Sequence, residues 1–330
     1  MQTFSIIIPV KPGGYVAACE HLKKIMPDDP RYEILLAEGS APSRQRNLAA
    51  REACGDVLYF LDDDSLIDPE NLALCSDGMS DPAVAVVGGP SITPAGDSRL
   101  QQLFGYALAS AFGSGAVRNR YRAYGEPRET TDKELILCNL AVRRSVFADL
   151  GGFNERLYPN EENEFLERVK SAGYKLLHVP TMRIFRSQRR TLKAFIRQMF
   201  SYGRGRGQQT LITSSYSVTS FIPLFFVAYL VLALICIKYV LLLLPLVIYL
   251  SAAFVSSLCV LRRTGRLFSL LLPGIYPLMH IVNGVGLLWG LINGKPEPVH
   301  DDSIRIRRIK GFGNKFSEQQ AHEESVAAAH

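Results

Sequence analysis

Residues 57–65 of this 330-residue chain are VLYFLDDDS, and this stretch decides the fold. Val57–Leu61 is a short run of aliphatic and aromatic residues, and three consecutive aspartates end it. Such a run, bounded by turn residues, predicts a strand that is buried on both faces of a sheet. The chain before and after it repeats the pattern, with strands predicted at Phe4–Pro9, Glu33–Ala37 and Ala83–Gly88 and helices at Tyr15–Met26 and Ser43–Cys54. The alternation predicts an α/β domain with a parallel sheet that helices cover on both faces.

Polar residues follow two of these strands at their carboxyl ends, where open α/β sheets bind ligands. Asp62 and Asp64 are two residues apart in extended chain, so their side chains point the same way and can face one cation. Carboxylate oxygens suit Mg²⁺ or Mn²⁺. The alternative is a solvated acidic turn, or a helix N-cap formed by Asp64 or Ser65. After the second strand, Glu38 either accepts hydrogen bonds from a nucleobase or ribose, or belongs to a plain glycine turn.

Two arginines and a later acidic cluster add to this candidate chemistry. Arg44 and Arg46 lie in the helix that follows Glu38, and they either pair with a diphosphate or belong to a solvated surface. The acidic run Glu161–Glu164 begins a helix predicted at 161–172. The helix dipole favours acidic residues at this end, which is one explanation of the run. The other is a carboxylate that serves as general base towards an acceptor hydroxyl.

The C-terminal part of the chain has a different composition. Only Lys238 is charged between Leu211 and Leu261, and no residue is charged between Leu267 and Gly294, which excludes a water-soluble monomer. We predict membrane spans at about 219–237 and 239–261, each near the ~20 residues that a bilayer requires. Prolines interrupt the third segment, 267–293, which either spans the membrane or is re-entrant or interfacial. We favour the second interpretation of this segment.

Charges that flank these segments predict the orientation. Arginines directly after the second span place the N-terminal domain in the cytoplasm by the positive-inside rule. Eight lysines and arginines and no acidic residue occur between Arg183 and Arg206, and a helix at about 190–203 is amphipathic. We expect this basic block to touch an anionic membrane face, and its position beside the spans argues against a nucleic-acid partner. The predicted organisation is a cytoplasmic domain at 1–210, a membrane region at 211–294, and a polar, partly disordered tail at 295–330.

Nine short motifs occur in an order that resembles the family 2 glycosyltransferases. They are IIIPV (6–10), EGS (38–40), RN (46–47), FLDDDS (60–65), CNLAVRR (138–144), GGFNE (151–155), EENEFLER (161–168), GYKLLHVP (173–180) and RQMFSYGRGRG (197–207). The resemblance covers roughly residues 3–210. With its membrane region, the chain looks most like bacterial membrane-associated members that build exopolysaccharide, of the succinoglycan-synthesis type.

The resemblance implies a GT-A fold with a Rossmann-like mixed sheet, a UDP- or GDP-linked sugar donor, a divalent metal and an inverting transfer. It also implies a set of donor-binding residues. Pro9 and Glu38 would line the nucleoside pocket, Arg44 and Arg46 would approach the nucleotide, and the remaining donor-binding positions are Asp62, Asp63, Gln198, Tyr202 and Arg186.

The resemblance further implies the metal ligands and the base. Asp64, with Asp62, would hold Mg²⁺ or Mn²⁺. Glu162 would be the base, one methylene longer than the family's usual Asp, and Glu161 is the reserve candidate. Arg186 stands about where many relatives carry a histidine that joins the metal site, and it is able to counter the diphosphate directly instead.

A domain tethered at the inner membrane of a bacterium suggests a polyprenyl-linked acceptor. The segment Gly203–Gly207 either meets the phosphates of that lipid through backbone amides or is a hinge before the first span. A polyisoprenyl-phosphate sugar synthase and a non-catalytic membrane scaffold are the alternative functions. A processive polymer synthase is disfavoured because QxxRW is absent, and a Rossmann dehydrogenase because no GxGxxG follows the first strand.

Overall fold

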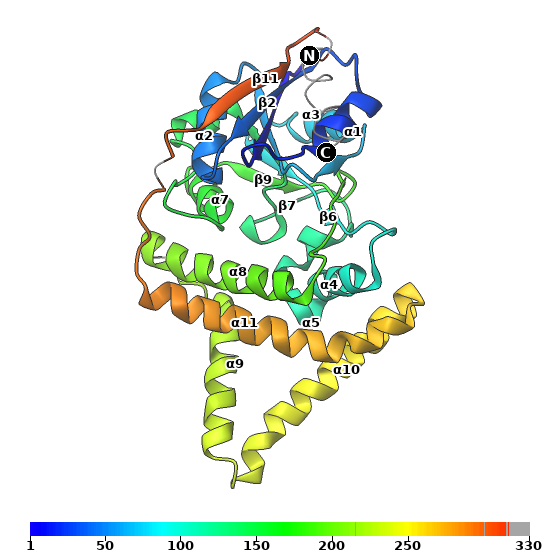
Figure 1. Ribbon diagram of the computed structural model, residues 1–330, viewed down its shortest axis with the longest axis vertical. Helices are drawn as coiled ribbons and strands as arrows, with labels where there is room; N and C mark the ends of the chain where they lie inside the picture. The colour runs from blue at the N-terminus through cyan, green and yellow to red at the C-terminus, as the bar shows by residue number, and fades with distance from the viewer. Residues whose placement is uncertain (215, 300, 315, 317–330) are drawn as a thin grey trace.

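The computed structural model describes residues 1–214, 216–299, 301–314 and 316. An eight-stranded sheet lies at the centre of the N-terminal domain, in the order β11-β2-β1-β3-β8-β5-β9-β7 (Figure 1). Its strands are β1 (Phe4–Val10), β2 (Tyr32–Glu38), β3 (Val57–Leu61), β5 (Val84–Gly88), β7 (Arg128–Glu129), β8 (Asn139–Arg143), β9 (Lys175–His178) and β11 (Arg305–Lys310).

The direction of the strands corrects one expectation. β2, β1 and β3 run parallel, whereas β8 pairs antiparallel with both β3 and β5. The mixed sheet that the resemblance implies is confirmed, and the purely parallel sheet that the strand–helix alternation predicts is wrong. The physical reason is the connection between β5 and β8, which runs through α4 (Arg99–Ala109), α5 (Ala111–Ser114) and short helical turns. It begins and ends at the same edge of the sheet, whereas the connection to a parallel strand has to cross to the opposite edge.

Alternate residues of each strand enter separate cores on the two faces of the sheet. Ile6 and Ile8 of β1 belong to one core, which also holds residues of α1 (Ala17–Ile25) and α3 (Asn71–Gly78). Ile7 belongs to the other core, with residues of α2 (Pro42–Glu52), α6 (Arg144–Asp149) and α7 (Glu161–Ser171). Because both faces are covered, β1 and β3 are continuous apolar runs. Functional side chains therefore gather beyond the strand ends rather than on a face.

A second, three-stranded sheet fixes the position of residue 186. It consists of β4 (Leu66–Ile67), β10 (Ile184–Phe185) and β6 (Ser91–Ile92). The amide of Arg186 continues this pairing, since it donates to the carbonyl of Ile92 at 3.0 Å. β4 begins just after the aspartate triplet, so the small sheet ties Arg186 to the end of β3.

The segment Gly113–Lys133 is polar and rich in glycine and arginine, a composition that predicts a mobile loop, but it forms short ordered pieces instead. They are η1 (Gly115–Tyr121), β7 and η2 (Asp132–Glu134). Arg120 is buried here, and its guanidinium donates to the carbonyl oxygens of Lys133 and Asp132. A buried arginine thus supplies donors that water otherwise provides to a polar loop.

A layer of helices lies beneath the sheet domain (Figure 1). It contains α4, α5, α8 (Leu192–Thr213) and α11 (Leu272–Ile292). Phe104 of α4 stacks on Phe195 of α8, with ring centroids 4.0 Å apart. The predicted amphipathic helix at 190–203 is the first half of α8, which continues through the GRGRG segment to Thr213.

Gly203–Gly207 is accordingly neither a hinge nor a phosphate-binding loop. A Cβ at Gly207 would lie 2.6 Å from the carbonyl oxygen of Leu287 on α11, and one at Gly203 would also overlap the α11 backbone. Gly286 and Gly290 of α11 face carbonyl oxygens of α8 in the same way. The glycines allow the two helix backbones to approach closely, which is the packing that small residues permit in membrane helices.

Three helices of the C-terminal part are long and apolar enough to cross a membrane by length and composition. After η3 (Val240–Leu243), α10 (Leu244–Thr264) forms a V with α9 (Val218–Ile235), and both extend away from the domain (Figure 1). Only 6% and 11% of their apolar windows are buried, against 39% for the segment of η4 (Leu267–Leu271) and α11. α11 runs alongside α8 across the base of the domain rather than down the V.

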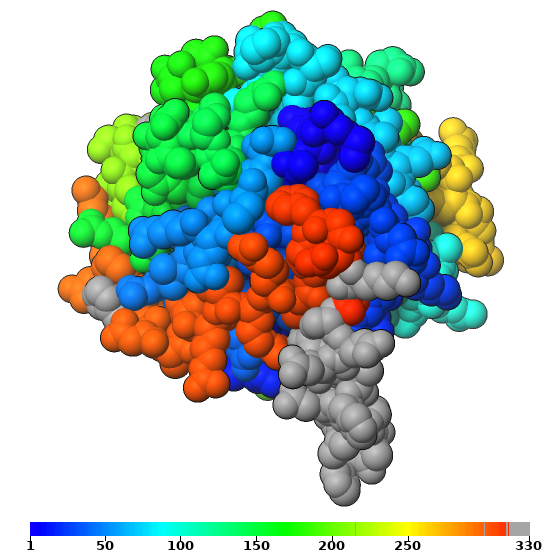
Figure 2. Space-filling view, turned by 90° about the horizontal axis from the view of Figure 1, so that it is seen from above, coloured from blue at the N-terminus to red at the C-terminus, as the bar shows by residue number. Residues whose placement is uncertain are grey.

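The tail after residue 294 returns to the N-terminal domain, which the sequence did not predict. β11 pairs antiparallel with β2, with Arg305 opposite Glu38. The ammonium of buried Lys310 donates to the carbonyls of Asp29 and Tyr32, at 2.8 and 3.1 Å. Figure 2 shows this segment, in orange and red, against the blue N-terminal part of the chain. Residues 318–330, which the sequence predicts to be disordered, lie outside the described residues.

Candidate active site

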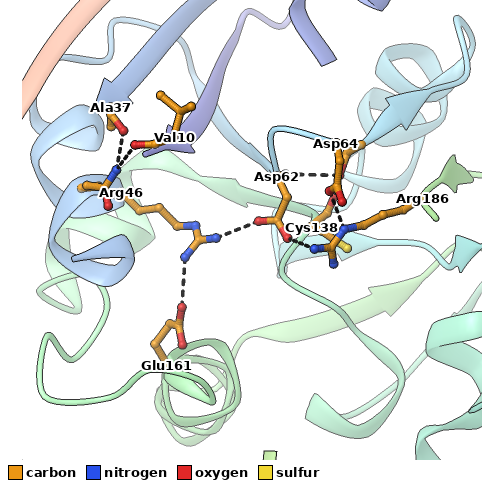
Figure 3. Close-up of polar contacts among 10 residues, drawn as sticks. Val10, Ala37, Arg46, Asp62, Asp64, Cys138, Glu161 and Arg186 are labelled. Atoms are coloured by element: carbon orange, nitrogen blue, oxygen red, sulfur yellow. Dashed lines mark hydrogen bonds and ion pairs between the residues drawn. The ribbon is translucent and has the colours of Figure 1, made fainter. Parts of the chain in front are cut away.

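Two arginines alternate with three carboxylates at the carboxyl end of β3 (Figure 3). Arg46 of α2 contacts Glu161 of α7 (Nη1–Oε1, 3.0 Å) and Asp62 (Nη2–Oδ1, 2.9 Å). Arg186 contacts the other oxygen of Asp62 (Nη2–Oδ2, 3.2 Å) and Asp64 (Nε–Oδ1, 2.6 Å). We call this chain of contacts the arginine–carboxylate ladder. It brings together five residues that the sequence predicts for the site.

Burial and charge act in opposite directions on the acidic members of the ladder. Burial opposes the ionisation of Asp62, but Arg186 and Arg46 outweigh it, and the pKa of Asp62 is lowered. Burial raises the pKa of Glu161, although Arg46 opposes the shift. Its Oε2 atom is buried and has no partner within the described residues. Asp63 forms no ion pair in the described part of the chain, and burial together with its two aspartate neighbours raises its pKa.

The aspartate triplet is held in a turn, not in a helix cap. Ser65 Oγ accepts from the amide of Asp62 at 3.2 Å and donates to the carbonyl of Cys138 at 3.4 Å. The next helix, α3, begins at Asn71, so the N-cap considered for Asp64 or Ser65 is not formed. Asp62 and Asp64 therefore remain at the strand end, where they face Arg186.

The acidic run of α7 divides into three roles. Glu161 belongs to the ladder, and Glu164 pairs with Arg168 at 2.8 Å within the helix. Glu162 has the weakest pairing, a 3.6 Å contact between its Oε1 and Nη1 of Arg120. Its side chain is largely buried, only 11% exposed, and has no strong charge partner among the described residues.

The two aspartates, which the sequence predicts as metal ligands, are a poor fit for a divalent cation in this arrangement. Both oxygens of Asp62 and one of Asp64 are already in contact with guanidinium groups. Among the described residues, no group of three or more His, Cys, Asp or Glu side chains is arranged to hold a metal. Arg186 lies where a third ligand would complete such a set. The metal assignment of Asp64 and Asp62 stays a prediction.

The predicted nucleoside edge lies at the end of β2, and the tail covers it. Pro9 of β1 lies opposite Ala37, one residue before Glu38. Glu38 accepts from the amide of Gly13 at 3.0 Å and lies 3.7 Å from Arg307 of β11. Asp301 accepts from the amide and hydroxyl of Ser40, at 2.7 and 2.8 Å. Arg44 faces the same tail, at 3.3 Å from Asp302, and takes no part in the ladder.

Gln198 and Tyr202 of α8 line a pocket beside Arg186. The amide of Gln198 donates to the Tyr202 hydroxyl at 2.7 Å, which fixes both side chains on one face of the helix. Arg189 and Tyr121 line the same pocket. Gln198, Tyr202 and Arg186 therefore lie together in the structure, and their role in donor binding stays a prediction.

Sequence reasoning missed three residues of this site. Arg120 and Tyr121 belong to the segment that was expected to be mobile, and Arg189 stood out only as part of the basic block. Arg120 also donates to Asn163 Oδ1, next to Glu162. The only signal in the sequence was composition, since four arginines and two tyrosines lie between residues 118 and 128.

Comparisons with known proteins give the chain its family. Succinoglycan biosynthesis protein ExoA of Rhizobium meliloti (strain 1021) is 27% identical over 195 residues, which cover 58% of this chain and 57% of that protein. The chain therefore matches little more than half the length of this curated relative.

Two solved structures are similar at low sequence identity. A mannosyltransferase from Pyrobaculum calidifontis, solved with GDP-Man and Mn²⁺, has a TM-score of 0.49 and 17% identity, covering 87% of each chain. TarS of S. aureus, residues 1–349 with UDP-GlcNAc, has a TM-score of 0.44 and 13% identity, covering 96% of this chain and 99% of that one. The model of the glycosyl transferase family group 2 matches residues 57–292, and the chain belongs to this family.

Proposed function

We propose that this protein transfers a sugar, with inversion, from a UDP- or GDP-linked donor to a hydroxyl of a polyprenyl-linked glycan in exopolysaccharide synthesis. The observation that carries the proposal is the arginine–carboxylate ladder at the carboxyl end of β3. It gathers two guanidinium groups where a diphosphate would arrive, and its Glu161 directly precedes Glu162, a carboxylate that lacks a strong partner.

The proposed reaction is a single displacement. The bond between the anomeric carbon and the diphosphate breaks, and its electron pair goes to the phosphate oxygen. The acceptor oxygen bonds to the opposite face of the carbon, and its proton passes to Glu162. Positive groups aimed at the departing phosphate stabilise the charge that develops there. We assign the proton to Glu162 rather than Glu161, because the ladder ties Glu161 to Arg46 and burial disfavours its charged form.

Removal of the base gives a direct test. We expect Glu162→Gln to lower turnover by about 10²–10⁴-fold, the usual contribution of general base catalysis, and to leave donor binding largely unchanged. Nucleoside diphosphate release and calorimetric binding of the donor measure the two effects separately. If Glu162→Gln retains full turnover while Glu161→Gln is inactive, Glu161 is the base.

The lipid-linked acceptor is supported by a groove on the other face of α8. Apolar side chains of α8 and α11 line it, and Lys193 and Arg197 lie among them. The apolar part suits a polyprenyl chain, and the two cations suit its diphosphate. The cations lie one helix turn apart on α8, the helix that carries Gln198 and Tyr202 into the pocket.

The chemistry of the product separates this function from its alternatives. Detergent-purified protein would receive each nucleotide sugar in turn with a polyprenyl-lipid extract. An extended lipid-linked oligosaccharide of inverted anomeric configuration supports the proposal. A sugar-phosphate lipid would instead identify a polyisoprenyl-phosphate sugar synthase, and binding without turnover would favour the scaffold.

The proposed location is the bacterial inner membrane, with the sheet domain in the cytoplasm. The pairing of β11 with β2 supports an even number of crossings, because both ends of the membrane region meet in one sheet. We therefore propose that α9 and α10 span the bilayer and that α11 lies in its interface. Two native cysteines test this: Cys54 is exposed on the sheet domain, and Cys236 ends α9 at the tip of the V.

In single-cysteine variants, an impermeant maleimide added to intact spheroplasts should label Cys236. Cys54 should react only after the membrane is opened. Labelling of Cys54 in intact spheroplasts would refute the orientation.

A further inference from the structure

Arg186 places a permanent positive charge between the two aspartates at the end of β3. Its Nε and Nη2 atoms contact Asp64 and Asp62, at 2.6 and 3.2 Å. The contact is built into the fold, because β10 and the Ile92 carbonyl position the backbone of Arg186. Its side chain is 21% exposed, so most of the group is withdrawn from water.

Asp62 and Asp64 already have positively charged partners within the chain. Arg46 and Arg186 together occupy both oxygens of Asp62, and Arg186 occupies one oxygen of Asp64. A divalent cation at these carboxylates has to displace Arg186 from two charge-assisted contacts. It would also leave that guanidinium buried without its partners, which is costly.

Arg186 still has donors for a ligand. A guanidinium has five N–H groups, and its planar fork matches phosphate oxygens. The contacts with the aspartates use Nε and Nη2, and Nη1 has no partner in the described part of the chain. The side chain also lines the pocket formed with Arg189, Gln198 and Tyr202. The pocket is narrow as it stands, with space for about one water molecule, so a diphosphate has to widen it and would then meet both arginines.

We propose that Arg186 takes the place of the divalent cation, so that donor binding and sugar transfer proceed without Mg²⁺ or Mn²⁺. This inference rests on the proposed function. As the bond to the anomeric carbon breaks, the phosphate oxygen that receives the electron pair is stabilised by hydrogen bonds from the guanidinium, which keeps its proton throughout. Asp62 and Asp64 position Arg186 for this step and do not ligate a metal.

The first test is chelation, with a direct measurement of metal binding. Turnover of the wild-type protein should change less than about twofold in EDTA, and electron paramagnetic resonance should show no tight Mn²⁺ site with UDP or GDP present. A loss of about 100-fold in EDTA that Mn²⁺ restores would overturn the proposal and support the metal predicted at Asp64.

Two substitutions make the test specific to Arg186. Arg186→His would combine an imidazole with Asp64 and the oxygen of Asp62 that Arg46 does not contact, a donor set that suits Mn²⁺. We expect this variant to bind Mn²⁺ and to require it for turnover. Arg186→Lys keeps the charge but loses the fork, and should weaken nucleotide binding by about 10- to 100-fold without creating a need for metal. An Arg186→His variant with unchanged, EDTA-resistant turnover would refute the assignment.

Failure of the proposed function is distinguishable from failure of this inference. If no donor turns over, calorimetric titration with UDP and with GDP in EDTA tests the role of Arg186 in nucleotide binding without turnover. Binding by the wild type that weakens at least tenfold in Arg186→Lys supports the role of Arg186 on its own. Binding that requires Mn²⁺ overturns it. Thermal unfolding of each variant shows whether it is folded.

Discussion

Gly286→Ala should separate α11 from α8. A methyl group at Gly286 would overlap the carbonyl oxygen of Phe200 and lie 3.1 Å from the amide nitrogen of Arg204. Both atoms belong to the backbone of α8, so no side chain can rotate away to make room. The helices themselves have to move apart, and the packing of Gly203 and Gly207 against α11 is lost with them.

The magnitude follows from two opposing effects. Overpacking costs about 1–3 kcal/mol, and the better helix propensity of alanine offsets about 1 kcal/mol. Because the obstacle is backbone, we expect a net loss of about 1–2 kcal/mol in the free energy of unfolding. That corresponds to a Tm lower by roughly 2–8 °C, at about 2–4 °C per kcal/mol.

The chain contains a matched control and a local probe. Gly274 lies on the same helix, and a methyl group added there would have no atom within 4 Å, so Gly274→Ala should leave Tm unchanged or raise it slightly. Trp289, the single tryptophan, lies on α11 with its ring centroid 6.5 Å from that of Phe200. Its fluorescence during thermal unfolding in detergent reports on this interface. Equal Tm values for Gly286→Ala and the wild type, or a larger loss in Gly274→Ala, would refute the reasoning.

Three further predictions concern the sheet domain. Arg308→Ala leaves fully buried Glu33 without its 3.1 Å partner. It should lower the free energy of unfolding by about 1–2 kcal/mol, after allowance for the 43% exposure of Arg308. Adding Glu33→Gln to this variant should recover part of the loss, and a double-mutant cycle of Tm values tests this. Burial raises the pKa of Glu161 from 4.5 to about 8, so the stability that Glu161 contributes is full below pH 4.5 and is lost as the pH rises through about 8. Glu161→Gln should remove this part of the pH dependence. A Tm difference between wild type and variant that stays constant from pH 4.5 to about 8 would contradict the prediction. Asp301→Ala frees the amide of Ser40, and hydrogen exchange there should become about tenfold faster or more; unchanged exchange would show that the tail does not protect this edge.

Local sequence patterns predicted β1, β2, β3 and β5 and where much of the candidate site lies along the chain. β3 spans the residues expected, Val57–Leu61, because a fully buried strand needs an apolar run and the aspartates end it. The motifs on β3, α2 and α7 were also placed correctly along the chain, because the ends of these elements lie close to where the sequence predicts them. The order of the strands then brings those ends to one edge of the sheet.

Long-range pairing was beyond prediction. β11 has the sequence RIRRIK, whose charges resemble a solvated tail, yet Arg308 pairs with buried Glu33 and Lys310 is itself buried against Tyr32. Arg186 and Asp64 are separated by 122 positions, and only the small sheet brings them together. The glycines of α8 suggested flexibility, because a sequence gives no sign of the helix that they will pack against.

The return of the tail constrains how the membrane region is built. The chain leaves the sheet domain through α8, forms the V of α9 and α10, passes along α11 and ends on the edge strand β2. α8 and β11 therefore hold the proposed membrane region at both ends, one at the pocket of Gln198 and Tyr202 and the other at the predicted nucleoside edge of Glu38. A single crossing or three crossings would put β11 and β2 on opposite sides of the bilayer, where they cannot pair. An interfacial α11 satisfies this constraint, and its glycine-mediated contact with α8 explains why this apolar helix stays beside the domain instead of joining the V.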